Sequence, residues 1–194
     1  MAYGKSIPPH YPSGWSDEFI SGDIARFGAR FRIASAFEGL SFKIGISKET
    51  AVGYSGIIHT FLAYTAYEKF SKTFGLGSDK KRAQIEAIHT SRELYESIYS
   101  KGRECKSFLK FLESETDSKS LRKNIEALLN KKEFSIILTG EAIRHAFAHG
   151  NLTPSSWKSD PKLVGDFCQL ISSFLVKVMD SESKGRIQGI KKKR

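Results

Sequence analysis

Residues 160–179 read Asp-Pro-Lys-Leu-Val-Gly-Asp-Phe-Cys-Gln-Leu-Ile-Ser-Ser-Phe-Leu-Val-Lys-Val-Met, and this stretch decides the fold class of the chain. Its apolar residues recur at spacings of three and four, the period of a helix that turns one wide face to a core. Asp160 suits the N-cap of such a helix, and Pro161 suits its first position. We therefore predict a long helix that begins at Pro161 and packs inside a helical bundle.

The same helical period fills most of the chain before residue 160. No segment shows the two-residue alternation, bounded by turn residues, that identifies a strand. Helices are expected over residues 17–42 (unbroken, or broken near Gly28 or Gly39), 47–74, 79–99, 104–115, 119–129 and 133–148. The sequence thus predicts an all-α protein, an antiparallel (up-and-down) helical bundle with helices beyond the basic four.

The two ends of the chain differ in composition from the part between them. Residues 1–16 include Pro8, Pro9 and Pro12, so we expect an irregular segment there. Residues 17–184 are expected to form a single helical-bundle domain. Residues 185–194 end in Lys-Lys-Lys-Arg and are expected to form a frayed helix end and a solvated basic tail.

Composition excludes several classes of protein. An apolar content of 40% with 14 Phe argues against disorder, and two distant cysteines argue against a disulfide scaffold. No apolar run reaches the length of a membrane span, and the first residues lack the apolar stretch of a signal peptide. We expect a cytoplasmic protein with no membrane partner. Its 31 Lys+Arg against 21 Asp+Glu give a net charge of +10, which favours an anionic partner such as nucleic acid.

The residue types that can carry chemistry gather at the end of one expected helix. Residues 141–150 read Glu-Ala-Ile-Arg-His-Ala-Phe-Ala-His-Gly. One interpretation is a metal site, because His145 and His149 share a helix face and Glu141 lies one turn earlier. Arg144 argues against it, since a guanidinium beside a dication weakens metal binding. We expect neither a metal ion nor another cofactor.

The other interpretation is cleavage of RNA without a metal. The 2′-hydroxyl of RNA is the nucleophile, so a site must move protons and stabilise charge on the phosphoryl oxygens. His149 suits the proton transfer, and Arg144 suits the phosphoryl group. The two lie about 140° apart on an ideal helix. Gly150 is a candidate C′ residue, however, which would place His149 at a frayed position free to depart from that angle. One Arg and one His do not supply both the base and the acid that the reaction needs. We therefore expect a two-fold dimer in which a second copy completes a composite site.

The run Arg-His-Ala-Phe-Ala-His-Gly over residues 144–150 resembles the signature of HEPN domains (higher eukaryotes and prokaryotes nucleotide-binding). In that family four to six residues separate an Arg from a following His, near the start of the last loop of a helical bundle. The resemblance implies a homodimer and a metal-independent endoribonuclease that leaves 2′,3′-cyclic phosphate ends, in a toxin–antitoxin or anti-phage setting. It makes Arg144 and His149 catalytic and His145 a supporting residue.

The resemblance leaves the partners and the activity open. One toxin branch carries a Tyr two positions after the His, where an antitoxin modifies it. This chain has Asn151 there, so that partner is not implied, although another antitoxin or a regulatory protein is compatible with the sequence. Some members have lost cleavage. The alternative is therefore a non-catalytic, HEPN-like helical module that binds RNA or a protein partner.

Other polar and aromatic residues have simpler interpretations. Trp157 and Asn151 are weak candidates for substrate binding, and packing over the end of the bundle is the alternative for Trp157. Arg82 and His89 match the same Arg-to-His spacing, but we interpret them as surface residues of a helix. His59 is expected to be a hydrogen-bonded core residue. Tyr54, Phe61, Tyr64 and Tyr67 are expected to pack in the core rather than stack on bases.

Overall fold

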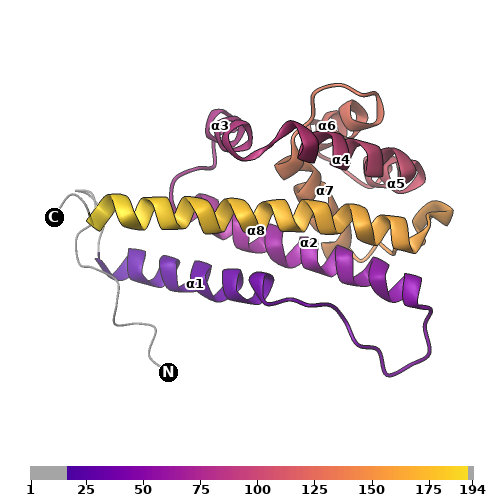
Figure 1. Cartoon of the computed structure of the whole chain (residues 1–194), viewed down its shortest axis with the longest axis horizontal. Helices are drawn as coiled ribbons and strands as arrows, with labels where there is room; N and C mark the ends of the chain where they lie inside the picture. The colour runs from indigo at the N-terminus through magenta and orange to yellow at the C-terminus, as the bar shows by residue number, and fades with distance from the viewer. Residues whose placement is uncertain (1–16, 192–194) are drawn as a thin grey trace.

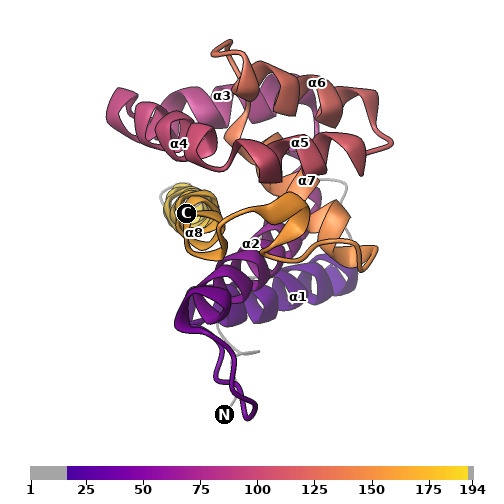
Figure 2. The same cartoon turned by 90° about the vertical axis from the view of Figure 1, so that its right-hand side faces the viewer.

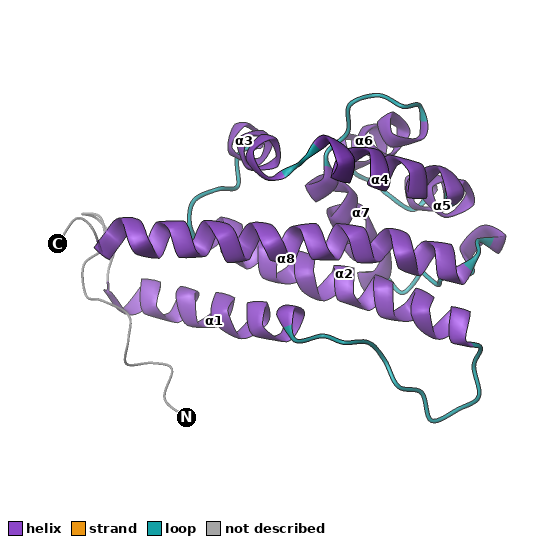
Figure 3. Ribbon diagram, in the orientation of Figure 1, coloured by secondary structure: helices purple, strands orange, loops and turns teal. Residues whose placement is uncertain are grey.

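The fold is all-helical, as the sequence predicts. The computed structural model describes the backbone of residues 17–191 and the side chains of residues 22–185. Those residues form α-helices and one short 3-10 helix and contain no strand (Figure 3). The expected irregular segment 1–16 and residues 192–194 lie outside the described part. In order, the elements are α1 (Asp17–Ser35), α2 (Lys48–Thr73), α3 (Asp79–His89), α4 (Arg92–Glu104), α5 (Lys106–Ser114), α6 (Lys119–Leu129), α7 (Ile136–Ala148), η1 (Ser156–Lys158) and α8 (Pro161–Lys191).

Three long helices, α1, α2 and α8, lie side by side (Figure 1). Helix α1 is antiparallel to α2, and the His59 ring of α2 donates from Nε2 to the Ala34 carbonyl at 3.0 Å. Helix α8 runs in the same direction as α2, since Gly53 lies against Pro161 and Thr60 lies against Cys168. None of the helices between residues 17 and 191 combines the length and apolar character that a membrane span requires.

The pairing of α2 with α8 depends on glycines that the sequence analysis did not single out. A Cβ at Gly56 would lie 2.5 Å from the carbonyl oxygen of Gly165. Real Cβ atoms do not approach so closely, so only glycine lets the two backbones come this near. The Thr60 hydroxyl then reaches across and donates to the Cys168 carbonyl at 2.9 Å. These contacts fix the register of the two longest helices.

Helices α3 to α6 form a second layer over α8 and α2, and α7 joins the two layers (Figure 2). Apolar side chains from both layers form a single core. The largest fully buried ones include Phe70, Phe108, Phe167 and Phe174. Of the α2 aromatics expected in the core, Tyr64 and Tyr67 are buried there. Phe61 and Tyr54 are half-buried, Phe61 edge-on against Phe147 of α7 and Tyr54 near Phe42.

Several helix ends differ from the sequence prediction. Helix α1 stops at Ser35 instead of residue 42, and the chain is irregular up to the Ser47 N-cap. The expected helix 79–99 is two helices, because the Ser91 hydroxyl accepts from the backbone N–H of Leu94 and starts α4. Helix α8 continues to Lys191, beyond residue 185 where the basic tail was expected to begin.

Candidate nucleic-acid site on α7

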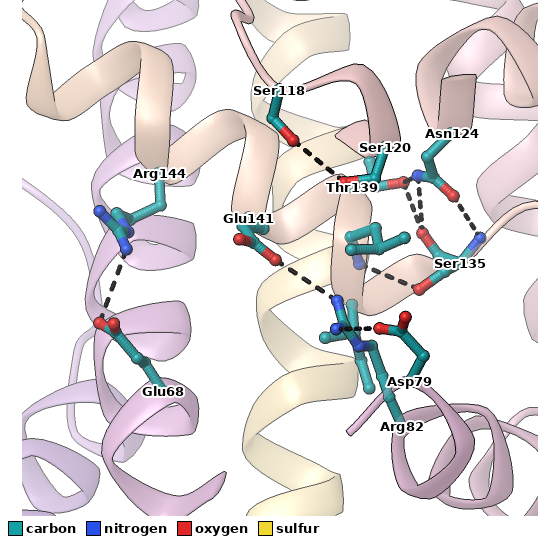
Figure 4. Close-up of polar contacts among 12 residues, drawn as sticks. Glu68, Asp79, Arg82, Ser118, Ser120, Asn124, Ser135, Thr139, Glu141 and Arg144 are labelled. Atoms are coloured by element: carbon teal, nitrogen blue, oxygen red, sulfur yellow. Dashed lines mark hydrogen bonds and ion pairs between the residues drawn. The ribbon is translucent and has the colours of Figure 1, made fainter. Parts of the chain in front are cut away.

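The start of α7 is held by side chains from two other helices (Figure 4). Ser135 is the N-cap, and its backbone exchanges hydrogen bonds of 2.6 and 3.0 Å with the Asn124 amide of α6. From α3, the Glu86 carboxylate accepts from the backbone N–H of Ile137 at 2.7 Å and from the Ser135 hydroxyl at 2.8 Å. The helix that carries the candidate site is therefore anchored at its first turn.

The end of α7 is a glycine stop. Gly150 has a φ of +75°, and its N–H donates to the Phe147 carbonyl at 3.0 Å. The N–H of Asn151 donates to the Ala146 carbonyl at 3.3 Å, which completes a Schellman motif with Gly150 at C′. The predicted C′ role of Gly150 is thus confirmed. His149 nevertheless keeps backbone angles in the right-handed helical region (φ −82°, ψ 0°), so it does not use the freedom that a frayed position would give it.

Arg144 faces α2 (Figure 4). Its Nη2 lies 3.6 Å from Oε2 of Glu68, and its guanidinium lies 5.7 Å from the centre of the Tyr64 ring. The side chain is 29% exposed, and its Nε is buried without a hydrogen-bond partner in the described part of the chain. Glu68 also accepts from Lys72 at 3.2 Å. These contacts hold the guanidinium in place, and its Nε–H group makes no hydrogen bond in the described part of the chain.

The two histidines of the motif lie together. The rings of His145 and His149 are 4.5 Å apart between centroids, and His149 is exposed. His145 is half-buried, and its Nδ1 has no hydrogen-bond partner among the described residues. Ala148, also exposed, follows Arg144 by four residues and His145 by three. Its methyl group therefore lies between them on the helix surface.

Within one chain the structure does not bring Arg144 and His149 together. No hydrogen bond or ion pair joins them among residues 22–185. Because His149 stays helical, the two side chains leave α7 about 140° apart. Arg144 is turned toward α2, whereas His149 packs on His145. The site of a single chain is a strip of α7 with a cation on one flank and imidazoles on the other.

The interpretation of Arg82 and His89 as surface residues is wrong. Arg82 is 19% exposed and pairs with Asp79 at 2.8 Å and with Glu141 of α7 at 3.5 Å (Figure 4). His89 is 10% exposed, and its Nε2 lies 3.0 Å from Oε1 of Glu182 on α8. Both side chains fasten α3 to the helices below it. Spacing along α3 could not reveal this, because their partners are distant in the sequence.

The remaining candidates have partners of their own. The Asn151 amide donates to Glu115 at 2.8 Å, which ties the loop after α7 to the end of α5. Trp157 is 55% exposed with a φ of +51°, and its ring centre lies 6.1 Å from that of Phe111. His59 is a hydrogen-bonded core residue, as predicted. No hydrogen bond, ion pair or ring contact joins Asn151 or Trp157 to Arg144 or the two motif histidines in the described structure.

Metal binding gains no support from the side-chain arrangement. Among the described residues, no group of three or more His, Cys, Asp or Glu side chains is placed to hold a metal ion. Glu141, the third ligand in the metal interpretation, is paired with Arg82 instead. The two cysteines are buried and unpaired.

Sequence reasoning missed the residues that surround Arg144. Glu68 and Tyr64 lie four residues apart on one face of α2, and both contact the guanidinium. Tyr64 was expected only as a core residue, and nothing near Glu68 in the sequence distinguishes it from other surface glutamates. Comparison with models of known protein families, with curated proteins and with solved structures finds no match for this chain.

Proposed function

We propose that this protein is a HEPN-like, metal-independent endoribonuclease with a composite active site across a homodimer. The observation that carries the proposal is the exposed strip of α7. A guanidinium fixed by Glu68 lies on one flank of this strip, and the exposed imidazole of His149 lies on the other. The exposed Ala148 and the half-buried His145 lie between the two flanks on the helix surface, and the strip is open to an RNA strand. The net charge of +10 supports RNA as the substrate.

The proposed reaction uses the 2′-hydroxyl of the RNA as nucleophile. His149 accepts the proton of that hydroxyl, and the 2′ oxygen attacks the phosphorus. The bond from phosphorus to the 5′ oxygen breaks, and that oxygen takes a proton from a second imidazole. Arg144 donates to the phosphoryl oxygens and stabilises their charge in the transition state. The products are a 2′,3′-cyclic phosphate and a 5′-hydroxyl.

A second copy of the chain supplies what one copy lacks. Arg144 and His149 diverge by about 140° on the same helix, so one phosphate cannot contact both at short range. In a two-fold dimer with α7 strips facing, His149 of one protomer lies opposite the partner's Arg144. The same arrangement provides one imidazole as base and one as acid. His145, against the His149 ring, orients it in this proposal.

The test is RNA cleavage in excess EDTA. Arg144→Ala and His149→Ala should each reduce the rate at least roughly 100-fold, the usual loss when a charge-stabilising donor or a general acid–base group is removed. Arg103→Ala is the matched control, because Arg103 is exposed on α4, away from α7, and its loss changes the net charge equally. Full activity of both α7 variants, or cleavage that stops with EDTA, would refute the mechanism.

One observation favours a second candidate function. The Arg144 guanidinium already has a carboxylate partner in Glu68, which offsets the charge that catalysis requires. A non-catalytic module that binds RNA or a protein partner is compatible with this pairing. Salt-dependent RNA binding with intact RNA under all buffer conditions would support the module and contradict the enzyme. A toxin–antitoxin or anti-phage setting in the cytoplasm belongs to the enzymatic proposal alone.

A further inference from the structure

A pocket of about 200 Å³ opens beside Arg144, between α2, α3 and α7. Its polar lining includes Tyr64, Tyr67, Glu68, Arg82 and Glu141. Tyr64 and Glu68 are the two residues that hold the Arg144 guanidinium. A group that enters the pocket therefore lies next to a phosphate bound at Arg144. Sites for drug-sized ligands usually exceed about 300 Å³, so this pocket suits a single planar ring system.

Tyr67, one of the residues that line the pocket, carries a buried hydroxyl without a partner in the described part of the chain. Tyr67 is 4% exposed, and its hydroxyl makes no hydrogen bond within the described chain. Burial raises the pKa of this hydroxyl to about 12, so it remains a donor at neutral pH. Buried hydroxyls are rarely left without a partner. A bound ligand with an acceptor atom would satisfy it.

The charged groups of the pocket place an acceptor beside a donor. The Glu141 carboxylate lies 3.5 Å from the Arg82 guanidinium (Figure 4) and also interacts with the Tyr64 hydroxyl, while Arg82 also pairs with Asp79. A carboxylate has about four lone-pair sites and a guanidinium five N–H donors, so both groups keep capacity for a ligand. Guanine carries two adjacent N–H groups, at N1 and N2, which match the two oxygens of a carboxylate. Its O6 and N7 acceptors match a guanidinium. Adenine, cytosine and uracil do not present two adjacent ring and amino N–H donors on one edge.

We propose that this pocket binds a guanine base of the RNA next to the scissile phosphate, with Glu141 and Arg82 as the residues that select it. The phosphate of the same nucleotide lies at Arg144, and the Tyr67 hydroxyl donates to the base. The phosphate part of this inference rests on the ribonuclease proposed above. The choice of base is a property of the pocket and is tested separately from cleavage.

The binding test uses the 3′- and 5′-monophosphates of the four ribonucleosides with the full chain, by calorimetry. A guanosine monophosphate should bind roughly 5- to 150-fold more tightly than the other three, the discrimination of one bidentate base contact. Glu141→Gln should abolish this preference. The control Glu126→Gln removes an exposed carboxylate of α6 and should retain it. Equal binding of all four, or no binding at millimolar concentration, overturns the inference.

A second variant covers the case in which Glu141→Gln fails to fold. Tyr67→Phe removes only a hydroxyl that has no hydrogen-bond partner among residues 22–185, so the melting temperature should not fall. Its affinity for the guanosine monophosphate should fall several-fold. Wild-type affinity in this variant overturns the proposed contact with the base.

Mapping of cleavage sites separates the two proposals. Cuts next to guanine in wild type that become indifferent to base in Glu141→Gln support both. Cleavage at all bases alike in wild type overturns the pocket and leaves the ribonuclease. Selective binding of guanosine monophosphate by a protein that cuts no RNA overturns the ribonuclease and leaves the pocket.

Discussion

Glu86 fastens α3 to the first turn of α7, and its replacement tests how that helix is held. Its carboxylate accepts from the Ile137 N–H and the Ser135 hydroxyl, at 2.7 and 2.8 Å. Glu86→Ala leaves both donors without their acceptor. Each donor that loses its partner costs about 1–3 kcal/mol, and the two donors lie in a half-buried place that water can reach, so we take the lower end for both and expect a loss of about 2 kcal/mol. For a chain of this length, that is a decrease of about 4–8 °C in melting temperature.

Glu86→Gln separates the hydrogen bonds from the charge. The amide oxygen still accepts both bonds, so the stability of this variant at neutral pH should stay within about 1 kcal/mol of wild type. Burial raises the pKa of Glu86 above its usual value of 4.5. At a pH just above 4.5, Glu86 keeps its proton in the folded protein, whereas the same carboxyl has released it in the unfolded chain. The contribution of this group to stability is therefore present at low pH and lost as pH rises through the folded-state pKa.

The assay is thermal unfolding of wild type, Glu86→Ala and Glu86→Gln at a series of pH values from 4 to 8. Relative to Glu86→Gln, wild type should lose stability as pH rises above about 4.5. Glu86→Ala should be the least stable of the three at every pH. Equal melting temperatures for the Ala and Gln variants would refute the role of the two hydrogen bonds. A difference between wild type and Gln that does not change with pH would refute the role of the buried charge.

Three further predictions concern packing, reactivity and charge. Gly56→Ala should lower the free energy of unfolding in urea by more than about 3 kcal/mol, since its Cβ would meet the Gly165 carbonyl oxygen at 2.5 Å. Gly28→Ala is the control, because a Cβ there has nothing within 4 Å, and it should raise stability by about 0.5–1 kcal/mol. A small loss of stability in Gly56→Ala would contradict the close contact. Cys105 and Cys168 should resist alkylation at neutral pH in the folded protein and react after denaturation. Burial raises the pKa of the Cys105 thiol to about 12 and that of the Cys168 thiol further, so little reactive thiolate is present. Rapid alkylation of either cysteine in the folded protein would disprove this. Glu68→Gln should change stability by less than about 1 kcal/mol, because the Arg144–Glu68 ion pair is partly exposed. In filter binding it should increase the RNA affinity and raise the salt dependence of that affinity by about one phosphate contact. An unchanged salt dependence would show that Arg144 does not contact phosphate.

The sequence predicted the helices better than it predicted where they end. Pro161 begins α8 and Ser47 caps α2 as expected, because a cap depends on residues within one turn. The break between α3 and α4 was missed even though Ser91 and the acidic Glu93 beside it form a capping signal. Helical period continued across the break, and period alone does not detect a cap.

At the candidate site, the sequence identified the residues but not their partners. Gly150 ends α7 as predicted, since its positive φ is a local requirement for a residue without a side chain. That Arg144 turns toward Glu68 rather than His149 follows from the packing of α7 on α2. The partners of Arg82 and His89 likewise come from α7 and α8.

By itself, the sequence determined the all-helical class, the starts of the long helices and the Arg-x4-His motif, because each depends on neighbours within a few residues. Only the tertiary structure decided the parallel pairing of α2 with α8, the anchoring of α7 by Glu86, and the pocket that joins Glu141 to Arg82. Those features require residues 49 or more positions apart to meet. Such meetings depend on how helix faces pack together, which the period of one helix does not specify.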